Sequence, residues 1–155
     1  METINIILDL DGVLITTPPW KSDEFLEDDY SKFNENCVEN LNSVLTLFPC
    51  KIWLSSTRRL VKTKDEFNTI FSKRKIINSI TDFLPSRPDL KTRREEVLSF
   101  LNQKQFKNFI IIDDDKSLNS LDSEIKKHLI LTTLLQGFNT EKLEEAIEKL
   151  NITQK

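Results

Sequence analysis

Glycine, histidine and cysteine are scarce in this sequence, and each shortage excludes a class of site. Two glycines, Gly12 and Gly137, are too few for a glycine-rich phosphate loop of the Walker or the dinucleotide-binding type. His128 is the single histidine, which rules out His-based triads and multi-histidine metal sites. Cys37 and Cys50 are too few and too separate for a disulfide framework or a zinc site.

Long apolar runs and a strong net charge are also missing. Because no run reaches about 18 apolar residues, we expect no membrane-spanning helix and no membrane partner. With 22 Lys and Arg against 25 Asp and Glu, the net charge is −3, which does not favour nucleic acid as a partner of the whole chain. The length of 155 residues predicts a single domain over residues 1–155. The cysteine usage is typical of a reducing, cytoplasmic compartment, and the oligomeric state stays open.

Hydrophobic patterning predicts that strands and helices alternate along the chain. Strands are expected at residues 4–8, 51–57, 80–83, 108–112 and 129–132, and helices at 34–48, 64–74, 92–104 and from 139 or 140 onward. The acidic stretch 23–29 is predicted to be a loop with a weak helical turn. This alternation indicates a doubly wound, Rossmann-like α/β domain with a mostly parallel five-stranded sheet and helices on both faces.

Carboxylates follow two of the most apolar strands at the point where each strand ends. Asp9 and Asp11 follow the first strand, and Asp113, Asp114 and Asp115 follow the fourth. Parallel strands bring their carboxyl ends to one edge of the sheet, where open α/β sheets bind ligands. Carboxylates held close together repel one another unless a cation joins them, and hard oxygen ligands of this kind suit Mg²⁺.

Four short motifs carry a resemblance to a known family. The stretch from Ile7 to Leu14, with its Asp-Leu-Asp-Gly sequence, resembles the first motif of the haloacid dehalogenase-like (HAD) phosphatases, which implies a HAD-like fold. Leu54-Ser55 resembles the second motif, Lys91 the third, and Ile112-Asp113-Asp114 the acidic fourth. The Trp-Leu-Ser-Ser strand, the Ile-Asp-Asp-Asp ending and the late Gly-Phe-Asn turn also resemble the small HAD domains associated with RNA repair proteins.

The resemblance implies roles for the acidic residues. Asp9 would attack phosphorus and become an aspartyl-phosphate, and Asp11 would act as the general acid and then the general base. Mg²⁺ would be held by the Asp9 carboxylate, the Asp11 backbone carbonyl and Asp113. Asp114 would lie just outside the metal ligands, and Asp115 has no counterpart in the motifs.

The resemblance also implies which residues bind the phosphoryl group. Ser55, with Ser56 beside it, would donate hydrogen bonds to the phosphoryl oxygens. Lys91 would neutralise the phosphoryl group and orient the nucleophile. Lys62 and Lys64 are rivals for that role, but Lys91 opens the helix that leads into the acidic strand.

The chain is too short between its motifs for the cap domain that many HAD enzymes insert. A capless site suits a large substrate, or one that a partner covers. Trp20, in the loop after the first motif, would either pack under that loop or stack on a base. Five arginines near the same edge would contact a nucleic-acid backbone or form an ordinary solvated surface: Arg58, Arg59, Arg87, Arg93 and Arg94.

The sequence therefore predicts a Mg²⁺-dependent phosphomonoesterase. Its substrate is left open among nucleic-acid ends, nucleotides, sugar phosphates and phosphoproteins. The alternative is a non-catalytic HAD-like domain that binds or senses phosphate. A topoisomerase-type acidic pair at Asp113 and Asp115 is disfavoured because that fold needs a Glu at the first strand. A receiver domain is disfavoured because its phospho-accepting Asp follows the third strand.

Overall fold

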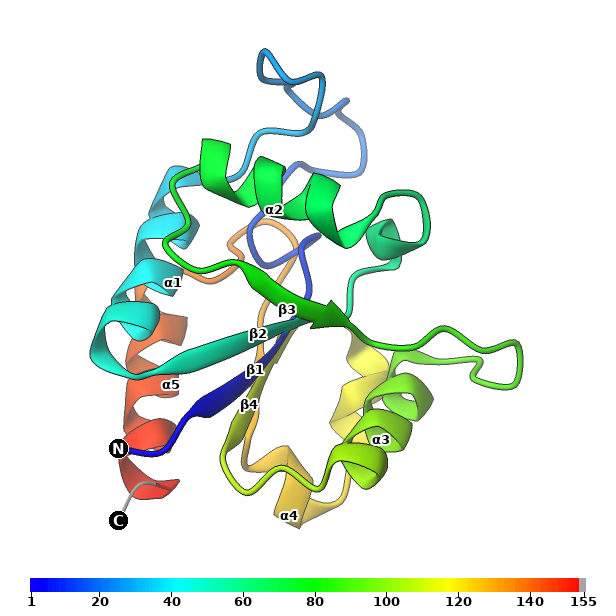
Figure 1. The fold of residues 1–155 in the computed structure, drawn as a ribbon, viewed down its shortest axis with the longest axis vertical. Coiled ribbons are helices and arrows are strands. Elements are labelled where there is room, and N and C mark those ends of the chain that lie inside the picture. The colour runs from blue at the N-terminus through cyan, green and yellow to red at the C-terminus, as the bar shows by residue number, and fades with distance from the viewer. Residues whose placement is uncertain (154–155) are drawn as a thin grey trace.

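Five parallel strands form one sheet in the order β3-β2-β1-β4-β5 (Figure 1). The computed structural model describes residues 1–153. The strands are β1 (Ile4–Leu8), β2 (Cys50–Leu54), β3 (Ile80–Phe83), β4 (Phe109–Asp113) and β5 (Leu129–Leu131). The helices are α1 (Glu35–Leu47), α2 (Lys64–Lys73), α3 (Arg93–Lys104), α4 (Ser123–Lys126) and α5 (Thr140–Thr153), with the 3₁₀ turns η1 (Thr57–Leu60) and η2 (Lys116–Ser120). The predicted doubly wound α/β fold is confirmed.

Side chains of the central strands alternate between two apolar layers. Ile6 and Leu8 belong to the layer covered by α1, α2 and α5, whereas Ile7 belongs to the layer beneath α3 and η2. Figure 1 shows α1 and α5 together on one side of the sheet and α3 and α4 on the other. Because both faces are covered, β1 is an almost unbroken run of buried apolar residues.

The start of α3 decides which side chain reaches the carboxyl edge of the sheet. Thr92 is the N-cap, and Glu95 completes the predicted capping box by accepting from the Thr92 backbone. Lys91 therefore precedes the helix, while Arg93 is its first residue. The helix boundary thus separates two cations that are only two positions apart in the sequence.

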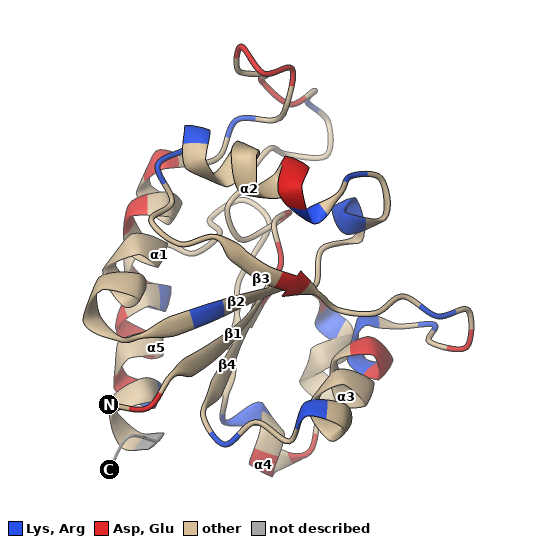
Figure 2. Cartoon of the chain, viewed as in Figure 1, with Lys and Arg blue, Asp and Glu red and all other residues tan. Residues whose placement is uncertain are grey.

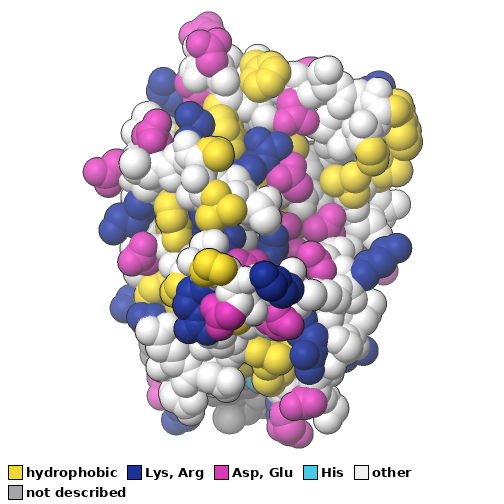
Figure 3. Space-filling model, turned by 90° about the vertical axis from the view of Figure 1, so that its right-hand side faces the viewer, with side chains coloured by type: hydrophobic (Ala, Val, Ile, Leu, Met, Phe, Trp, Pro, Cys, Tyr) yellow, Lys and Arg dark blue, Asp and Glu magenta, His cyan; other side chains and the backbone are white. Residues whose placement is uncertain are grey.

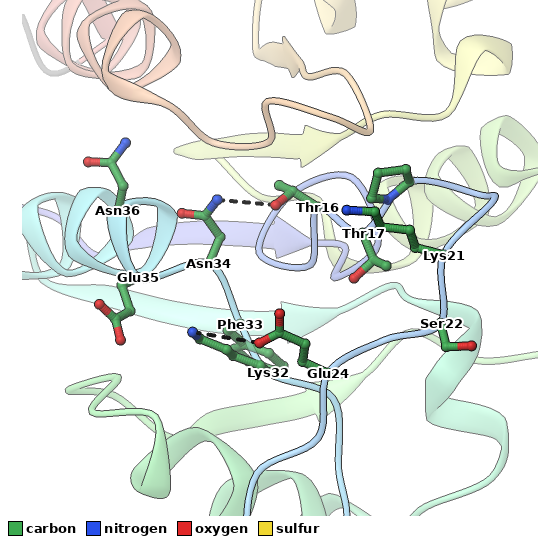
Figure 4. Close-up of a pocket in the computed structure, with 11 residues that line it drawn as sticks. Thr16, Thr17, Lys21, Ser22, Glu24, Lys32, Phe33, Asn34, Glu35 and Asn36 are labelled. Carbon is green, nitrogen blue, oxygen red and sulfur yellow. Dashed lines mark hydrogen bonds and ion pairs between the residues drawn. The ribbon is translucent and has the colours of Figure 1, made fainter.

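The flap, defined as residues 16–33, joins β1 to α1 above the carboxyl edge. The predicted helical turn within it is wrong, because Phe25 and Ser31 form an antiparallel bridge around a turn at Asp29, whose φ is 59°. Its base is tied by the Asn34 amide, which donates to Thr16 Oγ1 over 3.1 Å, a bond drawn in Figure 4. The flap is an ordered strap rather than an inserted domain, and the described chain contains no cap domain.

No helix in the described residues 1–153 is both long enough and apolar enough to cross a membrane.

Candidate active site

Asp9 and Asp113 occupy the carboxyl ends of two adjacent strands. Asp9 directly follows β1, and Asp113 is the last residue of β4, the strand paired with β1 on one side. The chain turns from β1 to β2 in one direction and reaches β4 in the other, so this position is the switch point of the sheet. Both carboxyl groups are buried, Asp9 being 4% exposed and Asp113 fully enclosed.

Three carboxylates converge at this point, because Asp114 joins the other two. One oxygen from each of Asp9, Asp113 and Asp114 lies within 4.8 Å of the others. Burial raises the pKa of Asp9, and burial together with the adjacent Asp9 raises the pKa of Asp113 to about 8. Burial and the nearby Asp113 also raise the pKa of Asp114. The cluster is short of positive charge.

Arg93, not Lys91, is the cation that reaches this cluster. Its Nη1 donates to Asp113 Oδ2 over 2.5 Å and lies 3.6 Å from Asp9 Oδ2 and 3.4 Å from Ser55 Oγ. The Arg93 side chain is buried, whereas Lys91 is exposed and its backbone N–H bonds to Glu95. The structure does not bring Lys91 to the site. The cation beside the acid cluster is the guanidinium of Arg93 and not the lysine ammonium that the resemblance implied.

Ser55 and Ser56 begin the loop that follows β2, and both are fully buried. The Ser55 N–H donates to Leu8 O over 2.8 Å, which holds this loop against the end of β1. The Ser56 hydroxyl accepts from the Arg58 N–H as the N-cap of η1. Arg59 stabilises this loop, because its Nη1 donates to the carbonyl oxygens of Ser55 and Ser56 over 2.8 and 3.0 Å. Ser55 remains beside Arg93, while the Ser56 hydroxyl already has a structural partner.

Asp11 lies at the outer rim of the site and is paired with Arg58. Arg58 Nε donates to one Asp11 oxygen over 2.8 Å and Nη2 to the other over 2.9 Å. The Asp11 side chain is 45% exposed, in contrast with the buried Asp9. The two carboxylates of the first motif therefore sit in different surroundings, which suits different roles.

The loop that carries Asp11 is braced by residues far along the chain. Thr132 Oγ1 donates to Gly12 O over 2.5 Å, and the Phe138 N–H donates to Val13 O over 2.9 Å. Gly12 itself has φ of 78°, and a Cβ at this position would overlap the Asp114 carboxylate. The close approach of the two acidic loops thus depends on a residue without a side chain.

Replacing Gly12 with Ala is expected to disrupt the acid cluster. The left-handed backbone alone would cost about 1–2 kcal/mol, and the methyl group would also displace Asp114. We expect a lower melting temperature and weaker Mg²⁺ binding, measured by thermal unfolding with and without MgCl₂. Asp122→Ala, which changes an exposed acid outside the three-carboxylate cluster, is the control. Wild-type Mg²⁺ affinity in the Gly12 variant would contradict this account of the loop.

The five arginines predicted near this edge do not form one basic surface. Arg59 and Arg93 are buried and both pair with Glu96, and Arg58 is held by Asp11. Arg87 is exposed but paired with Asp89. The remaining Arg94 is half-buried, its backbone N–H bonded to Ser117. Figure 3, which views the carboxyl edge, shows charges of both signs interspersed.

Trp20 is 74% exposed in the flap. The interpretation that it packs beneath the flap is therefore wrong, and stacking on a ligand stays a prediction. The flap also lines a pocket of about 400 Å³ at the start of α1, with Lys21 and Lys32 among its lining residues (Figure 4). This pocket is lined by neither the acid cluster nor Arg58.

The donor set fits a small divalent cation. Carboxylates whose pKa values are raised by burial and mutual repulsion would be stabilised in their charged forms by a metal ion. Asp9 and Asp113 would supply carboxylate oxygens to Mg²⁺, and the Asp11 carbonyl is the predicted third protein ligand. Asp114, expected just outside the ligands, belongs to the same carboxylate cluster and is a further candidate ligand.

The parallel sheet, with acidic residues at the ends of β1 and β4, defines a HAD-like domain. The family model for the HAD domain in Swiss Army Knife RNA repair proteins matches residues 5–143, and the chain belongs to this family. The match extends from β1 into α5 and so covers all five strands. The comparison with curated proteins found no match.

Proposed function

We propose that the protein is a Mg²⁺-dependent phosphomonoesterase that works through an aspartyl-phosphate on Asp9. The observation that carries the proposal is the buried cluster of Asp9, Asp113 and Asp114 at the switch point of a HAD-like sheet. Such a cluster lowers stability unless a cation joins it, so its presence favours a functional rather than a structural role. Mg²⁺ would supply charge neutralisation to the phosphoryl oxygens.

The residues divide the chemistry between them. An Asp9 oxygen attacks phosphorus, and the bond from phosphorus to the leaving oxygen breaks as Asp11 donates a proton to that oxygen. Asp11 then removes a proton from water, which attacks phosphorus and breaks the bond to Asp9. Arg93 holds Asp113 in place and offsets the negative charge beside Asp9. Ser55 donates to the phosphoryl group.

A large substrate suits this architecture better than a small metabolite. The flap is a single strap and the described chain has no cap, so the site does not enclose a small molecule by itself. The family description refers to RNA repair proteins, which supports phosphate-ended nucleic acids as the first substrates to try. The exposed Trp20 would give such a substrate a surface on which to stack a base.

Hydrolysis assays test the proposed function directly. We expect turnover of p-nitrophenyl phosphate in MgCl₂ and its loss in EDTA. A panel of 3′- and 5′-phosphorylated DNA and RNA oligonucleotides, nucleotides and sugar phosphates would then rank the substrates. Phosphate binding without turnover of any compound would favour the alternative, a phosphate-sensing domain, and would contradict the proposed hydrolase.

The stability of the metal-free protein should fall as pH rises, and Mg²⁺ should oppose this fall. The pKa of Asp113 is raised to about 8, so between about pH 4 and pH 8 the folded protein keeps a proton that the unfolded chain releases. The contribution of this group to the metal-free protein therefore falls as pH rises through that range. Because Mg²⁺ binds carboxylates, its stabilising effect should be larger at pH 8 than at pH 6.

Thermal unfolding in EDTA and in MgCl₂ at the two pH values measures this difference. Asp122→Asn, which changes an exposed acid outside the cluster, is the control and should keep the larger Mg²⁺ effect at pH 8. Asp113→Asn removes both the titrating group and a proposed ligand and should lose that effect. An equal Mg²⁺ effect at both pH values in the wild-type protein would contradict the predicted coupling between proton and metal.

A further inference from the structure

Arg58 is fully engaged in hydrogen bonds, and its partners lie on two separate segments. Nε and Nη2 hold the two oxygens of Asp11, while Nη2 also donates to Asp23 Oδ2 over 3.1 Å. Nη1 donates to Ser31 Oγ over 3.1 Å and to the Tyr30 hydroxyl over 3.3 Å. These contacts account for the five N–H donors of a guanidinium. One edge therefore faces Asp11 and the other faces the flap.

The flap side of this network is firmly built. Ser31 donates to Asp23 over 2.5 Å, and this bond, with the contact to Arg58, lowers the pKa of Asp23. Arg58 also lies over the Tyr30 ring, 5.5 Å from its centroid. The acidic flap is visible as red segments at the top of Figure 2. The backbone N–H of Arg58 is capped by Ser56, so the arginine is fixed at its base as well.

The Asp11 side of the network conflicts with the role proposed for Asp11. A general acid needs a protonated oxygen, but both oxygens of Asp11 accept bonds from a permanently charged guanidinium. The pair is also partly exposed, with Arg58 23% and Asp11 45% accessible, so it is weaker than a buried pair and open to exchange. Arg58 must release Asp11 before Asp11 can donate a proton.

A phosphoryl group is a suitable replacement partner for the same edge of Arg58. The fork of Nε and Nη2 that binds a carboxylate also binds two phosphate oxygens, with a larger charge on the partner. Arg58 follows β2, the strand paired with β1, and binds Asp11 in the loop that begins with Asp9, so its fork lies at the same carboxyl edge as the nucleophile. The flap contacts of Nη1 would keep the guanidinium in place during the exchange.

We propose that Arg58 is a phosphate-binding residue whose binding edge is occupied by Asp11 in the free protein. An arriving phosphoryl group takes that edge and frees Asp11 for proton transfer. This inference rests on the proposed function. It explains why Asp11 is paired with Arg58, although proton transfer by Asp11 does not require an arginine. Acid/base capacity then develops only when a phosphorylated ligand is bound.

A double-mutant cycle on phosphate binding tests this exchange. Affinity for inorganic phosphate is measured by calorimetry in MgCl₂ for the wild type, Arg58→Gln, Asp11→Asn and the double variant. Loss of the bidentate guanidinium should weaken binding about tenfold or more. Removal of the competing carboxylate should tighten binding about threefold to tenfold, and this gain should disappear when Arg58 is also replaced.

Asp89→Asn is the matched control. Asp89 also forms a bidentate pair with an arginine, Arg87, through Nε and Nη2, but this pair is exposed and lies in the loop before α3. Its phosphate affinity should stay within about twofold of wild type. If Arg58→Gln fails to fold, Arg58→Lys keeps the charge without the fork and should give an intermediate loss.

Four results would overturn the proposal. The first is wild-type phosphate affinity in Arg58→Gln, and the second is an Asp11→Asn gain that persists without Arg58. The third is a loss in Asp89→Asn equal to that in Arg58→Gln, and the fourth is no phosphate binding by the wild type. The cycle measures binding alone, so its failure is distinguishable from failure of the proposed hydrolase. If the wild type hydrolyses phosphate esters but the cycle shows no coupling between Arg58 and Asp11, only the proposed role of Arg58 is rejected.

Discussion

Asp9→Asn should reduce phosphatase turnover to background while leaving the protein folded. The amide cannot attack phosphorus, and loss of a nucleophile lowers rates by more than roughly 10³-fold. Burial, together with repulsion from Asp9, raises the pKa of Asp113 to about 8. The same change should therefore raise the melting temperature in EDTA at about pH 9, where both carboxyl groups of the pair are charged and repel each other. Activity and thermal stability should therefore move in opposite directions.

Initial rates on an aryl phosphate and thermal unfolding in EDTA check both halves of this prediction. Asp82→Asn, at the exposed end of β3, is the control and should change neither quantity appreciably. Substantial turnover in the Asp9 variant would reject the nucleophile. A lower melting temperature with lost activity would point to damaged folding instead.

Arg93→Gln should lose activity by about 10²–10³-fold, whereas Lys91→Ala should remain within about twofold of wild type. The buried guanidinium offsets charge beside Asp9 and Asp113, and the exposed ammonium of Lys91 lies outside the cluster. Because Arg93 is a buried partner, its loss should also destabilise the protein by about 3–5 kcal/mol. Kinetics in MgCl₂, at a temperature where circular dichroism shows the variant folded, measure the first effect.

Arg93→Lys separates charge from geometry at the same position. The ammonium keeps the charge, but it cannot contact Glu96 and the acid cluster through two separate nitrogens as Arg93 does through Nε and Nη1, so activity should recover only in part. A strong loss in Lys91→Ala with a mild one in Arg93→Gln would restore the sequence-based assignment and contradict the one favoured by the structure.

The fold and the acidic edge follow from local patterns. Apolar runs that end in Asp9 and Asp113 mark β1 and β4, and in a parallel sheet strand ends meet at one edge. The capping box of Thr92 and Glu95 also predicts where α3 begins. With Thr92 as the N-cap, Lys91 precedes the helix and Arg93 is its first residue. The resemblance implies Lys91, because the family keeps its lysine where this helix opens, but the first residue of the helix is Arg93.

Other parts of the site depend on contacts that no local pattern reveals. The pairing of Arg58 with Asp11 spans 47 positions, and the pairing of Arg74 with Asp28 spans 46. The sequence left the five arginines near this edge open between nucleic-acid contacts and a solvated surface, but acids of the flap and of α3 use several of them as structural partners. The flap likewise takes its shape from Arg74, whose contact holds the pKa of Asp28 at about 2.

The bond from Thr132 to Gly12 joins residues 120 positions apart and has a consequence for folding. Closing so large a loop has an entropic cost, and Thr132 is placed by β5, which pairs with β4 at the edge of the sheet. The turn that carries Asp11, the proposed acid/base residue, would then reach its final geometry only after β5 has docked. A chain stopped before that step would have most of its sheet, but the acidic edge would lack its final geometry. Metal affinity would then measure completion of the last folding step.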